Sequence, residues 1–148
     1  MSGAALLDIN VLLALFDPNH VHHDIAHDWF AEIDNAGWAS CPLTENGFLR
    51  TARVSRTSTF VSIPELIDRL RAFQTSSGHE FWPDDVSLLD GALFNARGIH
   101  GTKQLTDIYL LALAAHRGGR LVTFDARIPL VAVKGAHSEH IVVLAPAK

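Results

Sequence analysis

The chain has 148 residues, of which 48% are hydrophobic and 19% are charged, so it can bury one sizeable core. We therefore expect a single domain over residues 1–148 and not a disordered tail. The formal net charge of −4 argues against a broad basic surface that holds nucleic acid by bulk attraction. Cys41 is the single cysteine, which excludes an internal disulfide framework and fits a reducing cytoplasm.

The apolar run at the N-terminus carries Asp8 and Asn10 and has no basic start. It therefore predicts a buried strand and a helix, and neither a signal peptide nor a membrane anchor. The strand is expected over 4–7 and the helix over 11–16, where an Asp-Pro-Asn turn at 17–19 ends it.

Helices and short strands alternate along the rest of the chain. Apolar residues at helical spacing, capping residues before them and glycine after them mark the helices. Predicted helices cover about 22–35, 44–54 with Thr44 as N-cap, 62–78 with a capping box at Ser62, 87–98, and 107–117 with Thr106 as N-cap. Predicted strands cover 38–41, 80–82, 121–124 and 141–144. This alternation predicts an α/β fold whose parallel sheet is covered by helices on both faces.

Four acidic residues interrupt or head apolar segments: Asp8, Glu45, Asp107 and Asp125. Two of them follow predicted strands and two lie in the first turns of predicted helices. Ligands of parallel α/β sheets bind beyond the carboxyl ends of the strands, so we expect the four carboxylates to face one cleft. Each acid alone has a structural explanation as a cap, a dipole partner or a turn residue, so the functional hypothesis depends on the four together.

Carboxylates gathered in one cleft would raise each other's pKa, so a bound cation is expected to keep them ionised. Surroundings made only of oxygen ligands suit Mg²⁺ or Mn²⁺. Such an ion is most useful where charge develops on a phosphoryl group, so the cluster indicates phosphodiester hydrolysis.

Four sequence blocks match a known family. They are Leu-Asp-Ile-Asn-Val at 7–11, Leu-Thr-Glu-Asn at 43–46, Thr-Asp-Ile-Tyr-Leu-Leu-Ala-Leu-Ala at 106–114 and Gly-Gly-Arg-Leu-Val-Thr-Phe-Asp at 118–125. With these blocks the chain resembles the PIN domain nearly end to end, and within that group the VapC-type toxins of toxin–antitoxin pairs. The last two blocks are specific, whereas segment 55–101 carries little family signal and leaves substrate choice open.

The resemblance implies a three-layer α/β/α sandwich with a central, mostly parallel five-stranded sheet. It also implies Mg²⁺ or Mn²⁺, selective cleavage of RNA, a homodimer, inhibition by a small cognate antitoxin, and no membrane association. The family's acidic quartet falls on the four acids named above, which are the predicted catalytic residues. We expect Asp8, Asp107 and Asp125 to hold the metal, directly or through water, while Glu45 orients a water for in-line attack.

Three polar residues are predicted to support the acids. Asn10 and Thr123 resemble the supporting polar residues of the family, and Thr106 is a further candidate donor beside Asp107. Each also has an ordinary structural explanation: local backbone satisfaction for Asn10, a helix cap for Thr106 and a plain strand position for Thr123.

Basic residues near the acids are candidates for binding RNA. Arg50, Arg53 and Arg56 recur every third residue after Glu45, which describes either a phosphate-guiding stripe or a solvated helix face. Lys103 and Arg127 lie close in sequence to Asp107 and Asp125 and are expected to neutralise flanking phosphates.

Three other functions are alternatives to a nuclease. A dinucleotide-binding oxidoreductase would need glycines in the first strand–helix turn, and the chain lacks them. A phosphatase using Asp8 as nucleophile, and a non-catalytic domain that keeps the acids as a metal-stapled scaffold, stay open as alternatives. The four histidines between 20 and 27 are expected to be structural, with His22 half-buried and the pair His23 and His27 facing solvent, and not to form a zinc site.

Overall fold

Five parallel strands form the centre of the fold in a computed structural model that describes residues 3–33, 36–54 and 61–145. The strands are β1 (Ala5–Leu7), β2 (Trp38–Ser40), β3 (His79–Phe81), β4 (Arg120–Thr123) and β5 (Ile141–Val143), in the spatial order β3-β2-β1-β4-β5. Leu6 of the central strand is level with Ala39 on one side and with Leu121 on the other. The prediction of a five-stranded parallel sheet is confirmed.

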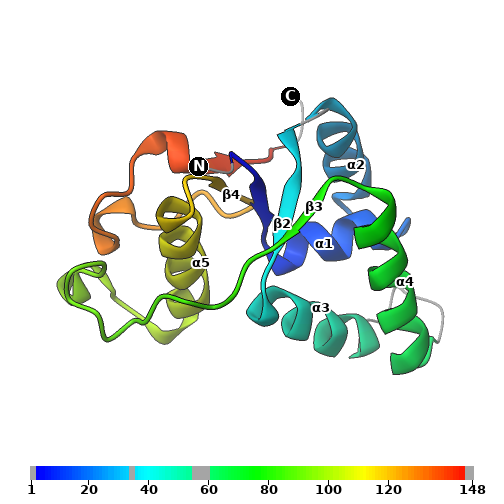
Figure 1. Ribbon diagram of the computed structural model, residues 1–148, viewed down its shortest axis with the longest axis horizontal. Helices are drawn as coiled ribbons and strands as arrows, with labels where there is room; N and C mark the ends of the chain where they lie inside the picture. Colours follow the sequence, from blue (N-terminus) through cyan, green and yellow to red (C-terminus); the bar gives the residue numbers. More distant parts are fainter. Residues whose placement is uncertain (1–2, 34–35, 55–60, 146–148) are drawn as a thin grey trace.

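Helices cover both faces of this sheet, and Figure 1 shows α5 on its left and α1 to α4 on its right. The helices are α1 (Ile9–Phe16), α2 (His23–Glu32), α3 (Pro42–Val54), α4 (Ile63–Ser76) and α5 (Leu105–His116). The predicted three-layer α/β/α sandwich is therefore confirmed. Within the described ranges, no helix is long and apolar enough to cross a bilayer.

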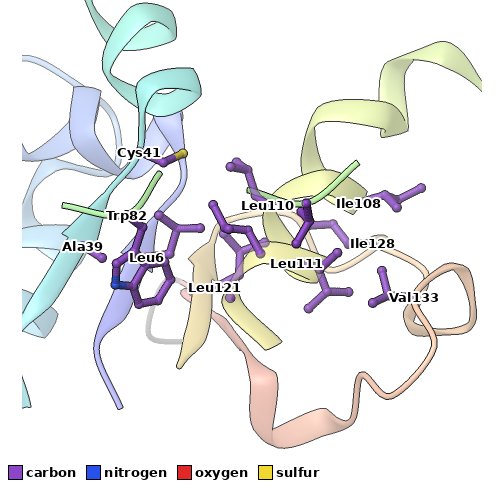
Figure 2. Packing of buried hydrophobic residues seen from close by; sticks show 14 of the residues in the cluster. Leu6, Ala39, Cys41, Trp82, Ile108, Leu110, Leu111, Leu121, Ile128 and Val133 are labelled. Carbon is purple, nitrogen blue, oxygen red and sulfur yellow. The ribbon is translucent and has the colours of Figure 1, made fainter. Parts of the chain in front are cut away.

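The three inner strands β1, β2 and β4 are largely buried on both faces, which explains why they are short and mostly apolar. Successive side chains of a strand point to opposite faces. Leu6 and Leu121 accordingly join a cluster with α5, which Figure 2 shows, whereas Leu7 and Val122 join a second cluster with α1 and Trp38 of β2.

Two glycines end α5 and bring the chain into β4. Gly118 has a φ of 70°, the left-handed conformation that commonly ends a helix. Gly119 is buried where a Cβ would collide with the carbonyl oxygen of Ala4 and would come within 2.8 Å of the Trp82 ring. Any side chain at Gly119 would therefore push β4 away from its neighbours.

The helix predicted over 87–98 does not form. This segment contains turns and a 3-10 helix at Ala96–Gly98. The Ser87 hydroxyl accepts a hydrogen bond from Leu89 N–H at 3.1 Å, and the Asp90 carboxylate accepts one from Ala92 N–H at 2.9 Å. Such local bonds offer the backbone an alternative to helical pairing, and they explain the wrong prediction.

Two of the predicted helix caps are also wrong. The α3 helix begins at Pro42, so Thr44 lies inside its first turn, where its hydroxyl donates to the Cys41 carbonyl at 3.0 Å. The α5 helix begins at Leu105, which places Thr106 inside it. By contrast, the Ser62 hydroxyl accepts from Glu65 N–H at 3.3 Å, as an N-cap does. Other element bounds differ from those predicted by one or two residues, except that α2 ends at Glu32 where the helix was predicted to reach 35.

Candidate active site

Three aspartates meet at the carboxyl edge of the sheet, on the side that faces α5. Asp8 directly follows β1 and caps α1, Asp107 lies in the first turn of α5, and Asp125 lies two residues after β4. Strand alternation puts Asp8 on the face of Leu6, towards α5. The negative charges of Asp8 and Asp125 both help to raise the pKa of Asp107, so the three carboxyls lie close enough to interact.

Asp8 is nearly buried, with 5% of its surface exposed, and both carboxylate oxygens are held. Oδ1 accepts a hydrogen bond from Ile9 N–H at 2.7 Å, and Oδ2 accepts one from the Thr123 hydroxyl at 2.8 Å. Burial raises the pKa of Asp8, while these two hydrogen bonds act in the opposite direction. The carboxylate is thus fixed in orientation before any ligand arrives.

Thr123 ties two of the aspartates together. Its buried hydroxyl donates to Asp8 and accepts a hydrogen bond from the backbone N–H of Asp125 at 3.1 Å. The Thr123 hydroxyl, at the end of β4, therefore fixes the position of both the Asp8 side chain and the turn that carries Asp125.

Asp107 is the most perturbed of the three acids. Burial is the main cause, and the charges of Asp8 and Asp125 add to it, raising the pKa of Asp107 to about 7. Its carboxyl is half-buried at the edge of the site. A cluster that keeps one carboxyl partly protonated near neutral pH is one that a cation would stabilise.

Asp125 borders a cavity of about 220 Å³ that opens beside Asp107. Its Oδ1 accepts hydrogen bonds from the backbone N–H of Arg127 at 2.8 Å and from the guanidinium at 3.1 Å, and these bonds lower the pKa of Asp125. In the described residues Oδ2 of Asp125 receives no hydrogen bond from protein. The cavity is lined by Lys103, Gln104, Asp107, Asp125, Arg127, Ile128 and Pro129.

Glu45 belongs to a different group of side chains. Its Oε2 accepts hydrogen bonds from the Ser40 hydroxyl at 2.8 Å and from the Gln74 amide at 2.9 Å, and His79 lies 2.8 Å from the same hydroxyl. Glu45 is neither among the charges that raise the pKa of Asp8 and Asp107 nor among the described residues that line the cavity. The structure thus gathers the three aspartates and holds Glu45 in a separate network.

The remaining predicted residues lie around this arrangement. Asn10 and Thr106 are exposed, and Asn10 is not among the donors to Asp8. Lys103 and Arg127 border the cavity, as their sequence positions suggested, and Arg50 is exposed on α3. The side chain of Arg53 and the whole of Arg56 lie outside the described residues.

Sequence reasoning missed Ser40, Gln74 and His79, because the network joins β2, α4 and β3, which are far apart in the sequence. The one local signal was Ser40, a polar residue between the apolar Ala39 and Cys41 in a strand that is buried on both faces.

The histidines between 20 and 27 pack among themselves and on Phe124. The ring of His22 lies 4.6 Å from that of Phe124, which fits the predicted half-buried anchor. The expectation that His23 faces solvent is wrong, because its Nδ1 lies 2.7 Å from the Ala14 carbonyl and the side chain is half-buried. His27 is exposed as predicted.

The aspartate cluster fits a hard divalent cation in its donor chemistry. Carboxylate oxygens are the ligands that Mg²⁺ and Mn²⁺ prefer, and burial together with the charges of Asp8 and Asp125 raises the pKa of Asp107. Across the described ranges, no three His, Cys, Asp or Glu side chains are already arranged to hold an ion. Mg²⁺ commonly keeps several waters and uses only one or two carboxylates, so this arrangement is compatible with it.

Comparison with known proteins assigns the chain to a family. The family model of the PIN domain matches residues 5–134. The chain belongs to the PIN domain family. It is similar to Ribonuclease VapC44 of Mycobacterium tuberculosis, with 46% identity over 140 residues that cover 95% of this chain and 99% of the relative.

Two further relatives from the same organism support the assignment of the chain to this family. Ribonuclease VapC39 is 46% identical over 127 residues, which cover 84% of this chain and 90% of the relative. Ribonuclease VapC38 is 43% identical over 125 residues, covering 84% and 86%. The protein is therefore a PIN domain of the VapC type, and the resemblance inferred from the sequence blocks is confirmed.

Proposed function

We propose that this PIN domain is a metal-dependent endoribonuclease toxin that hydrolyses RNA phosphodiester bonds at the aspartate cluster. Relatives that share 46% of their residues with it are named ribonucleases. The observation that carries the proposal is the meeting of Asp8, Asp107 and Asp125. Burial and the charges of Asp8 and Asp125 raise the pKa of Asp107, and a bound cation would offset both.

The three aspartates would hold Mg²⁺ or Mn²⁺, directly or through water. When bound, such an ion supplies Lewis-acid stabilisation of the phosphoryl charge and makes water more acidic. Thr123 would support the site by holding Asp8 and the turn that carries Asp125 in place. Asn10 and Thr106, both exposed near these acids, are candidate donors to water or to a phosphate oxygen. Glu45 is held in a separate network, but α3 follows β2, the parallel neighbour of β1, so Glu45 comes from the same edge of the sheet as Asp8, and from there it would orient the attacking water.

Positive charge around the cavity would hold the RNA backbone. Lys103 and Arg127 border the cavity that contains Asp107 and Asp125, where flanking phosphates would add further negative charge. Arg50 and Arg53 on α3 would guide the strand away from the site. These contacts go to phosphates and so position the RNA without selecting its sequence.

The partners follow from the same proposal. A VapC-type toxin implies a small cognate antitoxin that neutralises it, and we expect this chain to have one and to act as a homodimer in the cytoplasm. Size-exclusion chromatography with light scattering, on the protein alone and after co-expression with a cognate antitoxin, would measure both assemblies.

The test is to map RNA ends in cells that express the protein and in cells that express Asp8→Asn or Asp107→Asn. We expect new RNA ends at recurrent sites with the unmodified protein only, and purified protein should reproduce them with Mg²⁺ but not with EDTA. Equal cleavage by both variants would refute the proposed site. A covalent aspartyl-phosphate trapped on Asp8 would instead favour the phosphatase alternative.

A further inference from the structure

The network around Glu45 can be resolved into donors and acceptors. A carboxylate oxygen only accepts, so the Ser40 hydroxyl must use its one proton on Oε2 of Glu45. His79 then has to donate from Nε2 to the Ser40 oxygen. The Gln74 amide nitrogen, 3.1 Å from that oxygen and 2.9 Å from Oε2, gives one N–H to each. Every hydrogen bond in the group therefore points towards Glu45 or towards the serine that holds it.

This arrangement treats the two oxygens of Glu45 differently. Oε2 receives two hydrogen bonds, from Ser40 and Gln74. Oε1 has no partner among the described residues, and it is not one of their buried unsatisfied atoms, so it is accessible to water. The carboxylate is thus held by one oxygen with the other free to accept a proton or a hydrogen bond.

The anchoring residues are well placed to fix this orientation. Ser40 is fully buried at the end of β2, one strand away from β1 and therefore from Asp8. Gln74 is half-buried on α4, and His79 packs against Trp38 with ring centroids 4.5 Å apart. The Glu45 carboxylate, five residues after Ser40, is thereby linked to β2, α4 and β3.

We propose that Ser40 and Gln74 are positioning residues for Glu45: they pin Oε2 and leave Oε1 to act on the attacking water. This inference rests on the proposed ribonuclease function and extends it to residues outside the aspartate cluster. Gln74 is the better test, because it is half-buried whereas Ser40 is fully buried, and its loss leaves the hydrogen bond between Ser40 and Glu45 in place.

Three variants on α4 separate positioning from general stability. Gln74→Leu removes both donated hydrogen bonds at similar volume, and Gln74→Lys keeps a donor of similar reach. Thr75→Ala, at the next position of the same helix, is the matched control, because its hydroxyl bonds only the Arg71 carbonyl within the helix. Each of the three substitutions is also combined with Glu45→Gln. Thermal unfolding of every variant is measured to detect losses of stability.

Cleavage is measured on a labelled RNA oligonucleotide that contains a site mapped in cells, and Mn²⁺ affinity is measured without RNA by calorimetry. We expect Gln74→Leu to lower kcat roughly 10-fold, the effect of losing hydrogen bonds to a charged group, with KM and Mn²⁺ affinity unchanged. Gln74→Lys should restore most of kcat, Thr75→Ala should match the unmodified protein, and Gln74→Leu should cause no further loss in the Glu45→Gln background.

Two results would overturn the inference: an unchanged kcat in Gln74→Leu, or an equal further loss when Glu45→Gln is already present. If Asp8→Asn is inactive at the same time, either result would refute only the positioning role of Gln74 and would leave the proposed ribonuclease site unaffected. Cleavage that survives Asp8→Asn and Asp107→Asn would instead refute the ribonuclease site itself. If Gln74→Leu does not fold, Gln74→Lys is compared with the unmodified protein instead. A Gln74→Lys protein that is equally stable but has lost kcat would contradict the inference, because it keeps a hydrogen-bond donor at position 74.

Discussion

Replacing Asp107 with asparagine is expected to stabilise the metal-free protein at neutral pH while abolishing cleavage. Burial and the charges of Asp8 and Asp125 raise the pKa of Asp107 from 3.8 to about 7. A shift of this size corresponds to at most about 4 kcal/mol against the ionised form. Because the side chain is only half-buried, solvent screening reduces this, and we expect a gain of about 1–2 kcal/mol in the free energy of unfolding at pH 8.

The gain has a defined dependence on pH. In the unfolded chain Asp107 loses its proton near pH 3.8, whereas in the folded protein it keeps the proton until about pH 7. Between these values the folded state binds more protons, so the unmodified protein loses stability as the pH rises from about 4 to 7. The advantage of Asp107→Asn should therefore be absent below pH 4, grow up to pH 7 and stay constant above it.

Urea denaturation followed by circular dichroism, at pH 5 and pH 8 in EDTA, measures this difference. Adding Mg²⁺ at pH 8 should stabilise the unmodified protein and leave Asp107→Asn nearly unchanged, since a ligand that binds only the folded state raises its stability. A variant that is less stable than the unmodified protein at pH 8 without metal would refute the argument from repulsion.

Three further predictions concern other parts of the molecule. Gly119→Ala should lower the free energy of unfolding by about 2 kcal/mol in urea denaturation, because a Cβ at this position collides with its neighbours. The control Gly91→Ala should change it by less than about 0.5 kcal/mol, because a Cβ at Gly91 would meet nothing within 4 Å. Thr123→Val removes the hydroxyl that holds Asp8 and should weaken Mg²⁺ binding by roughly 10-fold or more in calorimetry; an unchanged affinity would exclude the supporting role. The Cys41 thiol, buried and with its pKa raised to about 11, should react with Ellman's reagent at pH 8 only after unfolding in guanidinium chloride, and rapid labelling of the native protein would contradict its burial.

Much of the fold could be predicted because its signals are local. The apolar segments at β1 and β4 and the spacing of apolar residues in α5 correspond to elements buried by the sheet, and their order alone indicates parallel strands with helices between them. The predictions failed where the local sequence permits a second backbone arrangement. Ser87 and Asp90 bond to nearby backbone and prevent a helix, and Thr44 is inside a helix because Pro42 can already occupy its first turn.

The candidate site also has one part that the sequence indicates and one part that depends on tertiary contacts. The sequence by itself determined that Asp8, Asp107 and Asp125 come at ends of elements that share one edge of a parallel sheet, because strand direction is fixed by the alternating pattern. Only the tertiary structure decided which acids interact. The face to which a side chain points, and the helix packed there, bring the three aspartates together near α5, whereas contacts with Ser40 and Gln74, distant in sequence, hold Glu45 in another network.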